Sequence, residues 1–211
     1  MAYDLEEQEK LDALRAWWDR YGTLVAVLVF VVVASIVGWR GWQWYQGHKA
    51  TQAMGYFEAL QSAAGQDGDE SVARIEAASA TLRDSFPGSG YTPRGVLIAA
   101  AALAEQGKLD AAREQLQWLV QNSKDPAFTA LAKLRLAAVL LEQEQYDQAL
   151  AQVADAPPSF EALYADRRGD ILMAQGKIEE ARAAWQRAVE AFGADPIAQI
   201  VQLKIDALAG A

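Results

Sequence analysis

The sequence predicts an all-α protein in which one N-terminal transmembrane helix precedes a solenoid of helical hairpins. Three observations support this fold class. An apolar run near the N-terminus contains no charge, the rest of the chain repeats its apolar residues with helical spacing, and a short motif recurs three times. The chain shows no alternation of apolar and polar residues of the kind that predicts β-strands.

The composition argues against several classes of function. The chain has 211 residues, of which 52% are hydrophobic, and this is enough for one membrane segment and one domain with a core. It has no cysteine and a single histidine, His48, so we expect no disulfide, no thiolate chemistry and no metal site. The formal charge of -9, without a cluster of Lys and Arg, argues against nucleic-acid binding. No nucleophile or cofactor motif occurs, so we expect a protein that is not an enzyme and binds no cofactor.

Residues 1–20 are predicted to form a short acidic cytoplasmic tail. A cleaved signal peptide begins with a basic segment, whereas this tail is acidic, so we predict an anchor that is retained. Leu11, Leu14, Trp18 and Tyr21 recur with helical spacing, and the tail is therefore either an amphipathic helix on the membrane surface or a solvated acidic segment. The charged residues of the tail are Asp4, Glu6, Glu7, Glu9, Asp12 and Asp19 against Lys10, Arg15 and Arg20.

Residues 21–39 are predicted to form the transmembrane helix. They carry no charged side chain, and at 1.5 Å per residue they extend roughly 30 Å, the thickness of the hydrocarbon layer. Three basic residues precede the span and only Arg40 and Lys49 follow it closely, so the positive-inside rule favours a cytoplasmic N-terminus. Aromatic residues typical of membrane interfaces flank the span, namely Trp17, Trp18 and Tyr21 before it and Trp39, Trp42, Trp44 and Tyr45 after it.

Residues 40–49 are expected to be a juxtamembrane linker, and residues 50–211 a domain of helical hairpins. Residues that break helices interrupt the pattern at 65–68, 87–90, 125–126, 157–158 and 195–196. We expect a first, weaker hairpin from residues 50–64 and 71–86. The segment after Pro196 is expected to be a terminal capping helix.

Three segments of the domain align with one another: "ALAEQGKLDAAREQL", "VLLEQEQYDQALAQV" and "ILMAQGKIEEARAAW". Each combines a glutamine, a turn, an apolar residue, an acid and an alanine. The glutamines are Gln106, Gln143 and Gln175, and their separations, 143 − 106 = 37 and 175 − 143 = 32, bracket the roughly 34-residue period of a tetratricopeptide unit. The repeat therefore predicts a tetratricopeptide-like solenoid, and because its units are degenerate, a simple array of helical hairpins is the alternative.

The tripeptide Arg168-Gly169-Asp170 would be an adhesion signal if it lay on an exposed loop. In the third unit, however, Gly169 stands at the small position where the two helices of a hairpin touch, and Ala181 and Trp185 reproduce the A-x-x-x-F spacing of the repeat. We therefore predict that the tripeptide lies within a helix and that Gly169 is structural.

The first helix of each hairpin is expected to line a concave face that binds a partner. We align the units on Gly107, Glu144 and Gly176 and predict a groove for an apolar or amphipathic segment, with charges at its rim. The alternative is that a terminal helix or a neighbouring subunit fills this groove. The predicted partner-binding residues are Arg94, Leu97, Ala101, Leu134, Arg135, Ala138, Leu141, Asp166, Arg167, Asp170 and Met173.

Nearly the whole chain resembles one family, the ancillary subunit of the bacterial SecYEG translocon. The resemblance rests on "LDALRAWWDRYG", "GWRGWQWY", "ADRRGDILMAQGKIEEARAAW" and "QLKIDAL". It implies a single-pass protein of the bacterial inner membrane, whose periplasmic repeat domain associates with the translocon and with a membrane-anchored periplasmic chaperone of the prolyl-isomerase type.

From this resemblance we expect a scaffold that links the translocon to chaperones and emerging chains. One alternative is a tetratricopeptide adaptor in cell-envelope or division assembly. The other is a hydrolase that uses Ser, Asp or Glu side chains, although the chain has no nucleophile-elbow sequence.

Overall fold

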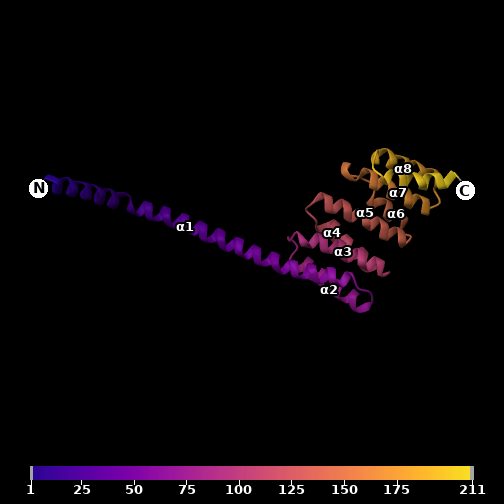
Figure 1. The fold of residues 1–211 in the computed structure, drawn as a ribbon, viewed down its shortest axis with the longest axis horizontal. Helices are drawn as coiled ribbons and strands as arrows, with labels where there is room; N and C mark the ends of the chain where they lie inside the picture. The colour runs from indigo at the N-terminus through magenta and orange to yellow at the C-terminus, as the bar shows by residue number, and fades with distance from the viewer. Residues whose placement is uncertain (1, 210–211) are drawn as a thin grey trace. The chain divides into compact units, whose positions relative to one another are not determined.

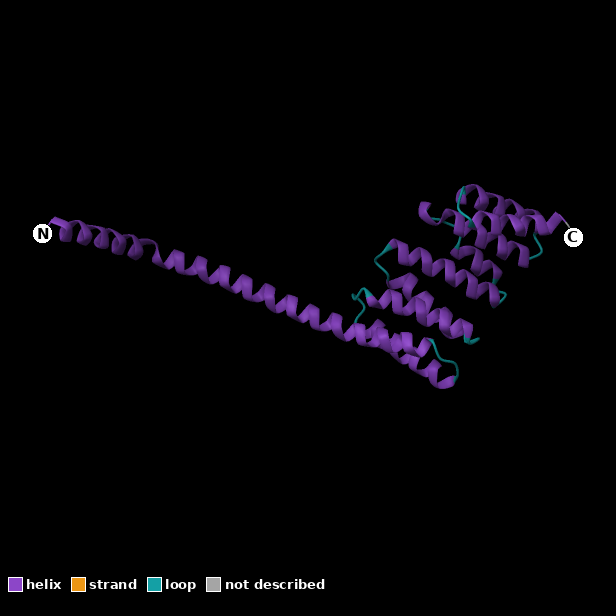
Figure 2. Cartoon of the chain, viewed as in Figure 1, coloured by secondary structure: helices purple, strands orange, loops and turns teal. Residues whose placement is uncertain are grey.

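The computed structural model describes residues 2–209, and every secondary-structure element within that range is helical (Figure 2). The predicted all-α fold class is therefore confirmed. The elements are α1 (Ala2–Ala64), α2 (Asp69–Ser85), α3 (Tyr91–Glu105), α4 (Leu109–Asn122), α5 (Pro126–Glu142), α6 (Tyr146–Gln152), the 3₁₀ turn η1 (Pro158–Phe160), α7 (Glu161–Ala174), α8 (Ile178–Phe192) and α9 (Ile197–Ala209).

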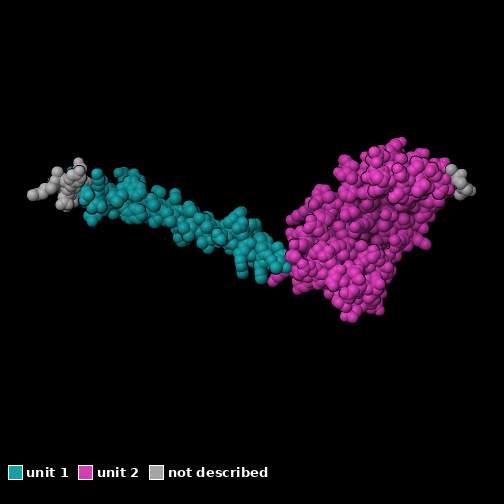
Figure 3. All heavy atoms as spheres, viewed as in Figure 1, with its two compact units in different colours: residues 1–51 teal, residues 52–211 magenta. Residues whose placement is uncertain are grey.

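The chain divides into two compact units, residues 1–51 and residues 52–211 (Figure 3). The first unit is formed by α1 and contains a segment long and apolar enough to cross a membrane. The aliphatic and aromatic side chains of this segment are exposed, Phe30 by 72% and Val37 by 65%. Such side chains favour hydrocarbon over water, so residues 21–39 remain a candidate span. The segments predicted as tail and linker are helical as well where they are described.

The second unit is built from helical hairpins (Figure 1). The last turns of α1 share a core with α2 and α3, and the pairs α3–α4, α5–α6 and α7–α8 follow along the chain. Each predicted break lies at a helix boundary, and α9 forms the expected terminal helix, which packs on α8. Asp125 caps α5 by accepting a hydrogen bond from the backbone N–H of Ala127, with Pro126 at the first helical position.

The turns within the three aligned hairpins share one backbone conformation. Gly107, Glu144 and Gly176 have φ values of 72°, 57° and 75°. In each hairpin the backbone N–H of the next residue donates to a carbonyl five residues earlier, as Lys108 does to Leu103 at 2.8 Å, a geometry that ends a helix. Glu144 has this left-handed conformation although it is not a glycine, and for such a residue the conformation costs roughly 1–2 kcal/mol. The packing of the hairpin, rather than the local preference of the residue, therefore imposes it.

The repeated glutamine joins each hairpin to the one before it. Gln143 Nε2 donates to Asp110 Oδ1 at 3.0 Å, and Gln175 Nε2 donates to Asp147 Oδ1 at 3.3 Å. Gln106 makes the corresponding link to the first hairpin through the hydroxyl of Ser71. The repeated acid of one unit therefore accepts from the repeated glutamine of the next, which explains why the two residue types recur together.

Two buried clusters form the core of the hairpin domain. The larger one extends from the end of α1 to α7, and the smaller one is centred on Leu172, Trp185 and Val201. Gly169 lies buried within α7, where a Cβ atom would overlap the indole of Trp185, so its predicted structural role is confirmed. Gly95 makes a similar close approach that the sequence did not indicate, since a Cβ there would lie 2.7 Å from Cδ1 of Leu82.

Candidate functional site

A groove of about 340 Å³ lies on the first helices of the second and third hairpins. Its floor is made of small and aliphatic side chains from α3 and α5, and Arg167 reaches it from α7. Five of the predicted partner-binding residues line this groove: Ala101, Leu134, Arg135, Ala138 and Arg167. These five come from three different hairpins, which is the arrangement expected of a concave face.

The other predicted residues on α3 and α5 do not line the groove. Leu97 is only 6% exposed and belongs to the core, so its side chain is not available to a partner. Leu141 is half-buried against the same core. Arg94 is exposed near the start of α3 but lies outside the groove.

Arg135 connects two hairpins while it borders the groove. Its Nη1 donates to the backbone carbonyl of Leu97 at 3.0 Å, and this ties α5 to α3. The carbonyl lies within a helix, so the guanidinium adds a second hydrogen bond to an acceptor that is already in use. Arg135 therefore helps to set the spacing of the groove walls, in addition to placing a positive charge at the rim.

On the last hairpin, α7–α8, the terminal helix α9 engages two of the predicted binding residues. Nζ of Lys204 in α9 lies 2.7 Å from Oδ1 of Asp166 and 2.7 Å from Oδ1 of Asp170. Asp170 also accepts from Nε1 of Trp185 at 3.2 Å and lies 3.5 Å from Arg167. These two carboxylates are therefore engaged within the chain by the terminal helix, and they do not line the groove.

The charges in this cluster are not balanced by Lys204 alone. Burial, assisted by the negative charge of Asp170, raises the pKa of the Asp166 carboxyl above its ordinary value, although the hydrogen bond from Lys204 lowers it. Burial also disfavours the charged ammonium, but its two carboxylate partners outweigh this effect and raise the pKa of Lys204. Two carboxylates thus share one lysine.

Comparison with known proteins places this architecture in a family. A family model described as a tetratricopeptide repeat-like domain matches residues 15–210. A protein of Neisseria gonorrhoeae named "Ancillary SecYEG translocon subunit" is 32% identical over 212 residues, which cover 99% of this chain and all of that protein. The chain belongs to the ancillary SecYEG translocon subunit family. Proteins with the same name from Haemophilus influenzae and Escherichia coli are 28% and 26% identical, over 99% and 96% of this chain and 100% and 96% of their own lengths.

In this member of the ancillary SecYEG translocon subunit family, several groove residues were not predicted from the sequence. Ala100, Ala104 and Leu131 contribute to the floor, and Glu105 and Glu142 stand at its edge. The alanine-rich segment 99–104 could have indicated the floor of the groove. Consecutive small side chains on a helix either allow a neighbouring helix to pack closely or leave a hollow between the helices. Met173 is 38% exposed at the end of α7 but does not line the groove.

Proposed function

We propose that this chain is a non-enzymatic, membrane-anchored interaction scaffold ancillary to the Sec translocon. The observation that carries the proposal is the groove across α3 and α5, which has a mostly apolar floor and lies on a domain of helical hairpins. The proteins that match nearly the whole chain are named ancillary SecYEG translocon subunits. The competing proposal is that the chain is a tetratricopeptide adaptor in cell-envelope or division assembly.

The groove is suited to one apolar or amphipathic segment of a partner. Its alanine and leucine floor offers area to aliphatic side chains, and burial of such area is worth roughly 25 cal/mol per Å² before the cost of association. Glu105 and Glu142 carry negative charge at the edge, whereas Arg135 and Arg167 carry positive charge. Opposite charges at the rim would fix the direction in which a segment lies.

The anchor would raise the effective concentration of the groove near the translocon. A tethered domain can then use weak contacts, because the binding event is no longer a free encounter in three dimensions. In this proposal the N-terminus is cytoplasmic, the span crosses the bacterial inner membrane and the hairpin domain is periplasmic. Its partners there are emerging chains and a membrane-anchored chaperone of the prolyl-isomerase type.

Cysteine labelling tests the topology, because the natural chain contains no cysteine. Ala194→Cys, in the exposed turn before α9, is expected to react with a membrane-impermeant maleimide in intact spheroplasts. Glu9→Cys, on the other side of the span, is expected to react only after lysis. The reverse pattern would contradict the proposed orientation and would place the groove in the cytoplasm.

Filling the groove tests the binding site. Ala101→Gln combined with Ala138→Gln adds polar bulk to two half-buried floor positions and is expected to reduce co-purification of translocon and chaperone by about ten-fold or more, the effect typical of a blocked hot spot. The matched control is Ala151→Gln at an exposed position of α6, which should bind as the parent does. Normal co-purification by the groove variant, with unchanged helicity, would exclude this groove. Recovery of cell-wall synthesis proteins without translocon would favour the competing assembly role.

A further inference from the structure

The outer layer of the hairpin domain contains one helix that is half the usual length. The second helices of the flanking hairpins, α4 and α8, have 14 and 15 residues, whereas α6 has 7. It ends before Val153, and Pro157 and Pro158 follow within a few residues. Because proline cannot continue a helix, the missing half leaves a space about two turns, or roughly 10 Å, long.

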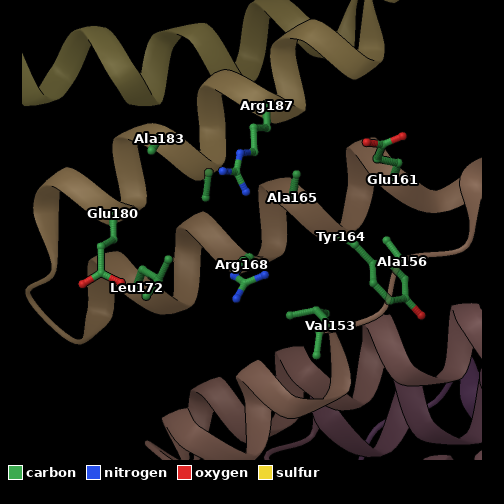
Figure 4. Close-up of a pocket in the computed structure, with 12 residues that line it drawn as sticks. Val153, Ala156, Glu161, Tyr164, Ala165, Arg168, Leu172, Glu180, Ala183 and Arg187 are labelled. Carbon is green, nitrogen blue, oxygen red and sulfur yellow. The ribbon is translucent and has the colours of Figure 1, made fainter.

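Beside this early end of α6, an open cavity of about 440 Å³ lies between the loop after α6 and the two helices of the last hairpin (Figure 4). Its apolar wall comes from Val153 in the loop, Ala165 and Leu172 in α7, and Ala184 in α8. Tyr164 also faces it, but the hydroxyl of Tyr164 already donates to the carbonyl of Ala130 at 2.9 Å. The ring of Tyr164 therefore offers only its carbon surface to an occupant.

Two arginines face this cavity without a partner in the described part of the chain. In Figure 4, Arg187 extends from α8 toward α7, and Arg168 points into the space beside Val153. Among the residues whose side chains the structure describes, no carboxylate lies within ion-pair distance of either guanidinium, although the nearby Arg167 and Arg182 both have one. Glu180 and Glu161 line the cavity on opposite sides of the arginines (Figure 4). Both guanidiniums are exposed to solvent and make no ion pair with these glutamates, so they remain available to a carboxylate of a partner.

We propose that this cavity, the α6 notch, binds a short α-helical segment of a partner protein that places an acidic side chain between Arg168 and Arg187. The dimensions follow from the missing half-helix, since a two-turn helix would complete the outer layer. The apolar wall fits a helix with small or aliphatic residues on one face. A carboxylate can accept paired hydrogen bonds from guanidinium groups, and Glu161 and Glu180 favour basic residues beside it.

This site is on different residues from the concave groove, so the two proposals can fail separately. The notch is lined by the loop after α6 and by α7 and α8, whereas the groove is lined mainly by α3 and α5. A partner can therefore occupy both at once, and a variant in one is expected to leave the other intact.

Photo-crosslinking from the full chain in inner-membrane vesicles tests the proposal. A benzophenone amino acid replaces Ala183, an exposed residue that lines the notch, and the adducts are mapped by mass spectrometry. We expect adducts on a protein segment that carries Asp or Glu within one helical turn of the crosslinked residue. Arg168→Gln with Arg187→Gln should lower the yield by about ten-fold, as expected for loss of charged hydrogen bonds.

The control is Arg74→Gln, which removes an exposed arginine of α2 that lies outside the notch and should leave the yield unchanged. The double arginine variant and this control must both retain the helicity of the parent. An equal yield from the double arginine variant would overturn the proposal. So would adducts confined to lipid, adducts confined to a second copy of this chain, or no adduct at all.

Discussion

Replacing Gly169 with alanine is expected to destabilise the hairpin domain by about 3 kcal/mol, at the upper end of the usual cost of overpacking. A Cβ at this position would overlap the indole of Trp185, at 2.8 Å from its Cγ. Trp185 is only 5% exposed and lies in the smaller core cluster, so the ring cannot move away without opening α8 from α7. Gly169→Leu should be worse, because its additional atoms enter the same contact. The measurement is the free energy of unfolding from denaturant melts followed by circular dichroism.

Gly90→Ala is the matched control for this substitution. Gly90 is exposed and has a φ of −64°, and a Cβ there would meet nothing within 4 Å. Alanine should therefore be neutral or should stabilise the protein by up to about 1 kcal/mol, because it lowers the conformational entropy of the unfolded chain. Combining Gly169→Ala with Trp185→Leu should cost less than the sum of the two single changes, because the smaller side chain leaves room for the Cβ. If Gly169→Ala melts like the parent, the close contact between α7 and α8 is wrong and an accessible Arg168-Gly169-Asp170 must be reconsidered.

Replacing Lys204 with methionine is expected to release α9 and to cost about 2 kcal/mol. Removing one partner of a fully buried ion pair costs roughly 3–5 kcal/mol. We expect a smaller loss here because the side chains of Lys204 and Asp166 keep partial contact with solvent. The variant leaves Asp166 and Asp170 side by side with only Arg167 to balance them. Amide hydrogen exchange should rise in α9 before it rises in α3 or α5, since the lost contacts are local. Uniform protection in α9 would show that the lysine does not hold the helix.

Asp166→Asn is the control that separates charge from packing. Because burial raises the pKa of Asp166, its charged form is disfavoured, and an amide that still accepts from Lys204 should cost less than about 0.5 kcal/mol. In the Lys204→Met background the same change should recover stability by removing one of the two unpaired carboxylates. A large loss from Asp166→Asn in the parent would show that its negative charge holds α9.

The same cluster predicts an unusual dependence of stability on pH. The folded pKa of Asp166 lies above its ordinary value of 3.8, so the folded state binds the proton more tightly than the unfolded chain. The contribution of Asp166 to the free energy of unfolding is therefore fully present below pH 3.8 and is lost as the pH rises through its raised, folded-state pKa. The contribution of Lys204, whose pKa is raised above 10.5, is present below 10.5 and lost as the pH rises through its folded value. Asp166→Asn should remove the acidic part of this profile and reduce the alkaline part, because only Asp170 then remains to raise the pKa of Lys204.

The sequence was sufficient to predict the order and the approximate limits of the helices. Helical spacing of apolar residues and breaks such as Asp125-Pro126 and Pro157-Pro158 act within a few residues, so they can be interpreted without tertiary contacts. The recurrence of Gln106, Gln143 and Gln175 identified the repeat, and Gly169 was correctly assigned to a helix contact. The apolar segment before the domain was also predicted from length and composition alone.

Only the tertiary structure decided which surface is open and which is occupied. Periodicity marks the side of a helix that is buried, but it does not say which neighbour buries it, and therefore Leu97 was placed on the groove although it lies in the core. Lys204 is 38 and 34 residues from the carboxylates that it binds, and no local pattern connects them. The shortened α6 was visible as an early proline stop, yet the cavity beside it depends on how α7 and α8 pack past the missing turns. Local sequence determines where a helix begins and ends, whereas an open site is what remains after side chains distant in sequence have packed together.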